Sequence, residues 1–233
     1  VESYAYKSII GGKMREFIVT VDGPAGSGKS TIAKIIAKKY GFTYLDTGAM
    51  YRMIALYALE NSISLDDTEA VEDMLKNTKL DIIGNQFFLN GKDVSEEIRT
   101  PRVSAIVSPV SAIKEVRVKL VDLQREISKG KSVILDGRDI GTVVFPNGDV
   151  KIFLVASPEE RAKRRLKEYE EKGVEADYES VLASIKERDY LDSTRKESPL
   201  KKAEDAHEID SSTMSIDEVV EAISKYIDEK IGA

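Results

Sequence analysis

The chain has 233 residues, a net charge of −6, one histidine and no cysteine, and 42% of its residues are hydrophobic. This length suits one large domain, or a core domain with small insertions, in an ordinary globular protein. Without cysteine, disulfides, thiolate metal sites and thiol catalysis are excluded, and the lone His207 excludes a histidine-rich metal site. The negative charge argues against a general nucleic-acid-binding face, so an anionic ligand has to be bound by local clusters of Arg and Lys.

No apolar run in the sequence approaches the roughly 18 residues that a membrane span requires, and residues 1–13 contain no apolar signal core. Met14 stands just before the first expected strand, so we expect residues 1–13 to be an N-terminal extension or an expression remnant, and residues 14–233 to be a single domain. We expect a cytoplasmic, monomeric protein that binds neither a membrane nor a nucleic-acid polymer.

Short apolar runs alternate with segments of helical periodicity along most of the chain. Strands that alternate with helices indicate βαβ units and a parallel sheet covered on both faces, so the expected fold class is α/β. The expected strands are 17–21, 42–45, 132–135, 150–155 and 208–210. The expected helices are 29–39, 49–61, 114–129, one that opens at 157–160, one that Asp177 caps and that runs through Arg195, and 216–230.

Residues 66–116 break this rhythm with three short strand-like runs, 80–83, 86–89 and 92–94. The dipeptides Gly84-Asn85 and Asn90-Gly91 separate the runs, and both suit two-residue hairpin turns. A three-stranded antiparallel meander inserted into the parallel core is therefore predicted. Thr100-Pro101 then has the pattern of a helix N-cap followed by proline at the first helical position.

The segment from Gly23 to Ser30 fits G-x-x-x-x-G-K-[ST] and lies between an expected strand and an expected helix, which is the context of a P-loop. Glycines let backbone N–H groups approach phosphate oxygens, and the helix N-terminus adds a positive dipole. Lys29 is expected to reach the β- and γ-phosphates, and the hydroxyl of Ser30 to ligate Mg²⁺. The predicted ATP-binding residues of this segment are Gly23, Pro24, Ala25, Gly26, Ser27, Gly28, Lys29, Ser30 and Thr31.

A second nucleotide-site pattern is the apolar strand that ends in Asp136. This is the Walker B pattern, whose carboxylate holds Mg²⁺, usually through water. Ser30 and Asp136 are therefore the predicted metal ligands.

A P-loop alone leaves three classes of protein open. A regulatory GTPase needs a guanine-reading N-K-x-D motif, which the chain lacks. A motor or remodelling ATPase usually places Glu after the Walker B Asp, whereas Gly137 stands here. A small-molecule kinase needs a second charged site, and candidate arginines follow several expected strands, where ligands of open α/β sheets bind. They are Arg52, Arg138, Arg161, Arg164, Arg165, Arg188 and Arg195.

Five motifs together resemble those of bacterial cytidylate kinases: D-G-P-A-G-S-G-K-S-T, L-D-T-G-A-M-Y-R, D-V-S-E-E-I-R-T, D-G-R-D-I-G-T-V-V-F-P and I-K-E-R-D. The resemblance runs from about Met14 to the C-terminus. It implies transfer of the γ-phosphoryl group of ATP to CMP or dCMP. It also implies a P-loop kinase core with a five-stranded parallel sheet flanked by helices, a nucleoside-monophosphate (NMP)-binding insertion with a small antiparallel sheet (about 47–116), and a short lid (about 158–176).

The resemblance also implies roles for individual residues. The catalytic set is Lys29, Arg138, Arg188 and Arg195. Arg161 and Arg165 belong to the lid over ATP. The implied CMP-binding set is Thr47, Tyr51, Arg52 and Arg138 at the phosphate, Ser108, Arg117 and Asp139 at cytosine, and Arg188, Asp192 and Arg195 at the sugar and the transferring phosphate.

The chemistry of this set is consistent with such an acceptor. A carboxylate at Asp139 can accept from the N4 amino group of cytosine, whereas uracil would present an oxygen to it. The CMP phosphate is largely dianionic at neutral pH and needs no general base, unlike a sugar or shikimate hydroxyl. A kinase for UMP or a shikimate-like acceptor, and a non-catalytic nucleotide sensor, are the alternatives.

Overall fold

The computed structural model describes residues 9–10, 13–14, 16–171 and 173–232, and the chain divides into two compact units. The first unit runs to Leu45 and resumes at Ser128, and the second is Asp46–Ile127. Of the expected N-terminal extension, residues 1–8 and 11–12 lie outside the described residues. Strands β1 (Ile9–Ile10) and β2 (Lys13–Met14) form a two-stranded antiparallel sheet.

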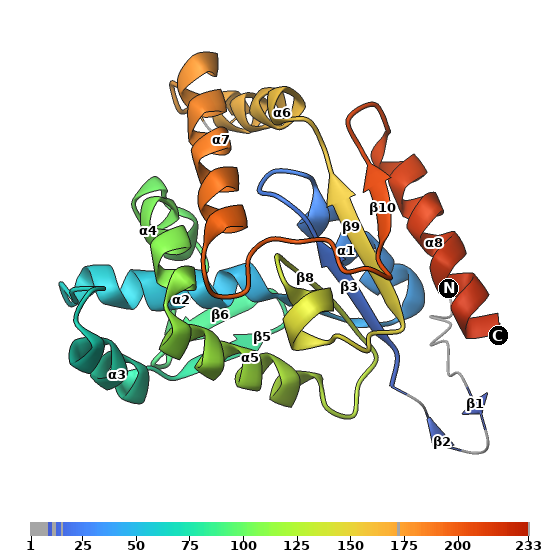
Figure 1. The fold of residues 1–233 in the computed structure, drawn as a ribbon, viewed down its shortest axis with the longest axis horizontal. Helices are drawn as coiled ribbons and strands as arrows, with labels where there is room; N and C mark the ends of the chain where they lie inside the picture. The colour runs from blue at the N-terminus through green and yellow to red at the C-terminus, as the bar shows by residue number, and fades with distance from the viewer. Residues whose placement is uncertain (1–8, 11–12, 15, 172, 233) are drawn as a thin grey trace. The chain divides into compact units, whose positions relative to one another are not determined.

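The first unit is built on a five-stranded parallel sheet in the order β10-β9-β3-β8-β4, which confirms the predicted α/β class (Figure 1). The central strand β3 pairs with β8 on one side and β9 on the other, so the P-loop segment leaves the middle of the sheet. The strands are β3 (Ile18–Asp22), β4 (Thr43–Asp46), β8 (Val133–Gly137), β9 (Val150–Val155) and β10 (His207–Asp210). The helices are α1 (Lys29–Tyr40), α6 (Pro158–Glu171), α7 (Tyr178–Thr194) and α8 (Ile216–Gly232).

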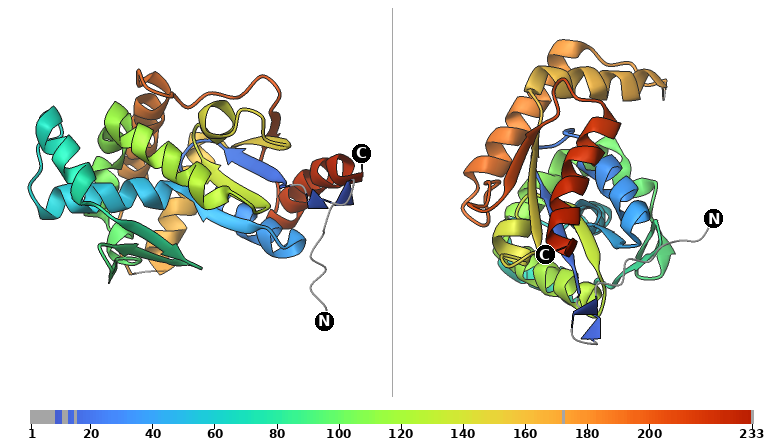
Figure 2. Two further views of the ribbon diagram at one scale, coloured as in Figure 1. Left: turned by 90° about the horizontal axis from the view of Figure 1, so that it is seen from below. Right: turned by 90° about the vertical axis from the view of Figure 1, so that its right-hand side faces the viewer.

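Helices α1 and α8 cover the sheet side by side (Figure 2, right). Ile36 of α1 and Ile223 of α8 are fully buried in one cluster with strand residues such as Val21 and Ile152. Full burial of a branched side chain stabilises the fold by about 1.5–3 kcal/mol, so this layer holds the central strands in place. The hydroxyl of Tyr40 also donates to a carboxylate oxygen of Asp228, at 2.7 Å.

Helices α6 and α7 pack on each other through a small cluster that contains Ala162, Val181 and Ile185. The predicted cap of α7 is confirmed, because Asp177 accepts from the backbone N–H of Ser180 at 3.0 Å. Helix α6 follows the carboxyl end of β9, so both helices are connected to the end of the sheet at which the P-loop lies (Figure 1).

The second unit contains the predicted three-stranded antiparallel sheet, in the order β5-β6-β7. Ile83 pairs with Gln86 and Leu89 with Lys92, so both connections are two-residue turns. Its strands are β5 (Leu80–Ile83), β6 (Gln86–Leu89) and β7 (Lys92–Asp93). Its helices are α2 (Thr47–Glu60), α3 (Thr68–Asn77), the 3₁₀ turn Glu97–Arg99, α4 (Pro101–Ala112) and α5 (Lys114–Ser128).

Two features go beyond the sequence-based expectations. Helix α3 buries Val71, Met74 and Leu75, and the side chain of Asp67 caps it. A π-helical turn, Ile140–Val144, follows β8 in the first unit. Such turns are rare in proteins, and those that occur are frequently at functional sites.

Within the described residues, no helix is long and apolar enough to cross a membrane.

Candidate active site

The P-loop segment joins β3 to α1, as the motif predicts. Gly28 precedes the helix in a left-handed conformation with φ of 91°, in which any residue with a side chain would be strained. At Gly23 a Cβ atom would lie 2.0 Å from the carbonyl oxygen of Leu154, so only glycine fits beside β9. As at any helix N-terminus, the backbone N–H groups of the first turn of α1 have no partner within the helix, and they are suited to bind phosphate oxygens.

The Lys29 side chain folds back over this loop. Its Nζ donates to the carbonyl oxygen of Pro24 at 2.6 Å and to Oγ of Ser27 at 3.3 Å. Burial, followed by the positive charge of Arg138, holds the pKa of Lys29 well below its usual 10.5. A polyphosphate placed against Nζ would supply the negative charge that this environment lacks.

The predicted metal ligands lie in contact with each other. Oγ of Ser30 donates to Oδ2 of Asp136 at 2.7 Å, and the hydroxyl of Tyr44 donates to Oδ1 at 2.9 Å. A serine hydroxyl and one carboxylate match the sparse, all-oxygen protein ligation that Mg²⁺ accepts when phosphates and water supply its other ligands. These residues therefore fit the ion that the sequence predicts.

Five predicted acceptor-site residues form a charge network in the first unit. Nε of Arg138 donates to Oδ2 of Asp192 at 2.9 Å, and Nη2 of Arg195 lies 3.9 Å from Oδ1 of Asp139. Burial alone would raise the pKa of Asp192, but Arg138, Arg188 and Arg195 together hold it below its usual value. The structure thus brings the residue pair after β8 together with residues at the end of α7.

Asp22 is a buried site residue that the sequence reasoning did not single out. Its two carboxylate oxygens accept from the backbone N–H groups of Ile140 at 2.8 Å and Gly141 at 2.7 Å. These are the first residues of the π-helical turn, and they follow Arg138 and Asp139 directly. Asp22 therefore fixes the backbone that carries both side chains. The carboxylate just before the first P-loop glycine was the available signal.

Burial is the largest influence on Asp22, and it raises the pKa of the carboxyl to about 7. The two backbone hydrogen bonds oppose this effect, and the neighbouring Asp139 adds to it. Gly141 lies close to this carboxylate: a Cβ there would be 3.3 Å from Oδ2 of Asp22 and 2.9 Å from Oγ1 of Thr20. The close approach leaves no room for a larger residue at the start of the turn.

The two predicted lid arginines occupy different environments. Arg161 is 2% exposed and contacts the P-loop, because its Nη1 donates to the carbonyl oxygen of Ala25 at 3.0 Å. Arg165 is about one-third exposed and pairs with Glu168 on its own helix at 3.6 Å. Only Arg165 therefore has a partly solvent-exposed guanidinium.

The remaining predicted CMP-binding residues lie in the second unit. Arg52 donates through Nη1 to Oγ of Ser104 at 2.8 Å. Arg117 is 5% exposed, donates to the carbonyl oxygen of Ser111 at 2.9 Å, and lies 5.3 Å from the ring centre of Tyr51. The buried residues Thr47 and Ser108 belong to helices α2 and α4 of this unit.

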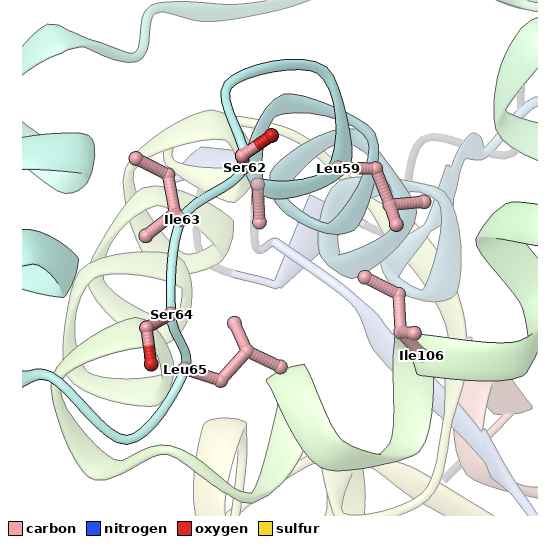
Figure 3. A pocket seen from close by; sticks show the side chains of 7 residues that line it. Leu59, Ser62, Ile63, Ser64, Leu65 and Ile106 are labelled. Atoms are coloured by element: carbon pink, nitrogen blue, oxygen red, sulfur yellow. The ribbon is translucent and has the colours of Figure 1, made fainter.

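A shallow pocket of about 400 Å³ in the second unit includes none of the predicted site residues (Figure 3). Its side chains are aliphatic or serine, and none is ionisable, so it lacks the charge that a phosphate requires. Among the described residues, no group of three or more His, Asp or Glu side chains could hold a metal ion by itself.

Comparisons with known proteins identify the family of the chain. The sequence profile described as cytidylate kinase matches residues 19–229. The cytidylate kinase of Fusobacterium nucleatum is 62% identical over 216 residues, which cover 93% of this chain and 99% of that protein. That of Carboxydothermus hydrogenoformans is 51% identical over 91% of this chain and 97% of its own length.

A comparison with a solved structure supports the fold but, at low sequence identity, no role. It is an uncharacterized protein from Eubacterium ventriosum, with a TM-score of 0.53 and 14% identity, covering 91% of this chain and 99% of that one. The profile spans a range that contains the P-loop, the strand that ends in Asp136 and helix α7, and each of the two relatives covers more than nine-tenths of the chain. The chain belongs to the cytidylate kinase family.

Proposed function

We propose that this protein transfers the γ-phosphoryl group of ATP to CMP or dCMP, producing ADP and CDP or dCDP. The observation that carries the proposal is the near-full-length match to cytidylate kinases. The arrangement of Ser30 against Asp136 and of Arg138 against Asp192 supports it. A dianionic phosphate acceptor is already nucleophilic, so alignment and charge neutralisation are the tasks left to the protein.

Lys29 is the donor that follows the transferring phosphoryl group in this proposal. Its present bond to Pro24 is exchanged for one to a phosphate oxygen when ATP binds. Ser30 and Asp136 would hold Mg²⁺, which neutralises charge on the phosphates of the nucleotide. The backbone of 23–31 cradles those phosphates, and Arg165 adds a cation from helix α6.

The arginines of the first unit act on the acceptor side. Arg138, Arg188 and Arg195 neutralise charge on the acceptor phosphate and on the phosphoryl group in transfer. Asp192 keeps the first of these oriented through the 2.9 Å bond to Nε. A fixed guanidinium needs little reorganisation during the reaction, which makes its electrostatic effect larger than in water.

Selection of cytosine is assigned to Asp139, Ser108 and Arg117. The carboxylate accepts from the N4 amino group, and the other two donate to the ring acceptors. Thr47, Tyr51 and Arg52 hold the CMP phosphate. A uracil base would leave a buried group unsatisfied, at a cost of about 1–3 kcal/mol.

The assignment of regions follows the same reasoning. Residues 47–116 act as the NMP-binding insertion and residues 158–176 as the lid of a single domain, 14–233. We propose a cytoplasmic monomer, since ATP and CMP are both available there and the P-loop and its metal ligands come from one chain. Sedimentation analysis tests the monomer, and a dimer at micromolar concentration would contradict it.

The decisive experiment measures ATP consumption by the purified protein with CMP, dCMP, UMP, AMP or shikimate as acceptor. The proposal expects the highest kcat/KM with CMP or dCMP. Preference for UMP or shikimate would identify another kinase class. ATP binding without turnover on any acceptor would indicate a nucleotide sensor, and hydrolysis that ignores the acceptor would indicate an ATPase.

A further inference from the structure

Arg161 links three parts of the first unit. Its Nε donates to the carbonyl oxygen of Ala156 at 2.9 Å, just after β9. Its Nη1 donates to Ala25 in the P-loop at 3.0 Å. Its Nη1 and Nη2 also donate to the two carboxylate oxygens of Asp189 in α7, at 3.0 and 2.5 Å. One guanidinium therefore contacts the P-loop, the sheet end and α7.

This geometry leaves Arg161 little capacity to bind a phosphate. A guanidinium has five N–H donors, and hydrogen bonds to Ala156, Ala25 and Asp189 occupy four of them here. Its side chain is 3% exposed, against 25% for Asp189. It also packs under the loop, since a Cβ at Gly26 would lie 3.5 Å from its own Cβ. To reach a nucleotide, it would have to leave a bidentate, buried ion pair.

Asp189 is one of two carboxylates on α7 that form ion pairs with arginines outside this helix. Three residues further along, Asp192 pairs with Arg138, which follows β8. Residues three apart lie on the same side of a helix, so the two carboxylates secure one face of α7 to the rest of the unit. Arg188, a proposed catalytic residue, lies immediately before Asp189 in the same helix.

We propose that Asp189 is a positioning residue, and that its ion pair with Arg161 holds the P-loop and α7 in a fixed relation. Arg161 is then a support of the P-loop backbone and not a ligand of the ATP phosphates. Nucleotide bound by the P-loop is thereby coupled to the placement of Arg188 and Arg195. The inference rests on the proposed function for the roles of those two arginines, but the support of the P-loop is independent of the acceptor.

The test begins with ADP binding measured by calorimetry, because this reports on the P-loop whatever the acceptor is. Asp189→Asn removes the charge and one of the two accepting oxygens while retaining a side chain of the same size. We expect it to weaken ADP binding by about 5-fold or more, the lower range of coupling between sites. If Arg161 is instead a phosphate ligand, the same variant frees its guanidinium and leaves ADP binding unchanged or tighter, which overturns the proposal.

Double substitution separates the two roles further. Arg161→Met alone should weaken ADP binding, and adding Asp189→Asn should weaken it no more, because both changes remove one interaction. Additive losses would contradict the pair as the acting unit. Asp189→Glu keeps the carboxylate and should recover part of the affinity, whereas Arg161→Lys cannot form the two-pronged contact and should not.

The matched control is a second ion pair between the same helices. Lys186 of α7 lies 3.5 Å from Glu159 of α6, and both side chains are about half exposed. Glu159→Gln should leave ADP affinity and CMP turnover within about twofold of the starting protein, because exposed pairs contribute little. An equal loss in this control would show that any disturbance of α6 and α7 has the effect, and would refute a specific role for Asp189.

Turnover with CMP completes the test. Asp189→Asn should raise KM for ATP and also lower kcat by roughly tenfold, about the effect of moving one catalytic group slightly out of place. Weaker ADP binding with normal kcat would confine the role of Asp189 to the P-loop and refute its coupling to Arg188 and Arg195. Absence of CMP turnover in the unsubstituted protein, with ADP binding intact, would refute the proposed function and leave the P-loop support standing.

Discussion

The carboxyl group of Asp22 makes a specific prediction about stability and pH. Its pKa is about 7 in the folded protein, against 3.8 for an unperturbed aspartate. Between these two values the folded chain holds a proton that the unfolded chain has released. The free energy of unfolding therefore falls as pH rises through this window, and the loss is complete above about pH 7.

The size of the effect follows from the same two values. One proton per molecule changes the free energy of unfolding by about 1.4 kcal/mol for each pH unit. Between about pH 5 and about pH 8 the contribution of Asp22 thus falls by about 2.5 kcal/mol. Asp22→Asn has no titrating proton, so its free energy of unfolding should lack this decline.

Urea unfolding of both proteins at these two pH values measures the difference. The stability of the variant relative to the starting protein should increase by about 2.5 kcal/mol from the lower to the higher pH. Asp66→Asn, at an exposed position, is the control and should follow the starting protein. Parallel pH dependence of Asp22→Asn and the starting protein would refute the buried, proton-holding carboxyl.

Three further predictions concern the site and the second unit. Lys29→Ala should lower kcat by about 100-fold or more while the protein stays folded, because one electrostatic donor to the transferring phosphoryl group is lost. Steady-state turnover and circular dichroism measure these two properties, and a near-normal kcat would contradict a catalytic role for Lys29. Asp139→Asn should lower the CMP/UMP ratio of kcat/KM by roughly 10-fold, since its amide can donate to uracil O4, and an unchanged ratio would remove Asp139 from base selection. Lys119→Met should lower the free energy of unfolding, measured with urea, by about 1–3 kcal/mol, because Nζ of Lys119 donates to the carbonyl oxygens of Leu75 and Thr78 at the end of α3. Unchanged stability would show that water replaces these hydrogen bonds.

The sheet and the hairpins could be predicted because local sequence decides them. Strand runs such as 80–83 and 150–155 have the bounds expected, and three of the four residues in the turn dipeptides have the positive φ values that favour glycine and asparagine. Gly84 has φ of 60°, while Asn90 and Gly91 have φ of 51° and 82°. These conformations are inexpensive for these residues alone, so the turn positions are readable from the chain.

Long-range contacts account for what the sequence did not reveal. Helix α4 continues through Pro109, although proline removes a hydrogen bond from a helix interior and argues for a break. The burial of Val103, Val107 and Val110 in the second unit offsets this cost. Nothing local marks the π-helical turn either, because it depends on the carboxylate of Asp22, more than a hundred residues earlier in the chain.

The charged residues of the first unit show why function is easier to read here than energetics. Motifs with arginine or a carboxylate predict Asp136, Arg138 and Asp192 as site residues, but only the structure shows which buried charges of this unit are unfavourable. Asp22 has a raised pKa and Lys29 a lowered one, so each charge is unfavourable in the protein as it stands. A bound polyphosphate would make the charge of Lys29 more favourable, whereas the charge of Asp22 stays unfavourable while its carboxylate holds the turn after Asp139. We therefore expect substitutions at Lys29 to affect turnover more than stability, and Asp22→Asn to change both in opposite directions at alkaline pH. The side-chain amide of the Asp22→Asn variant can accept a hydrogen bond from only one of the two backbone N–H groups. The substitution therefore loosens the turn while it removes the buried charge.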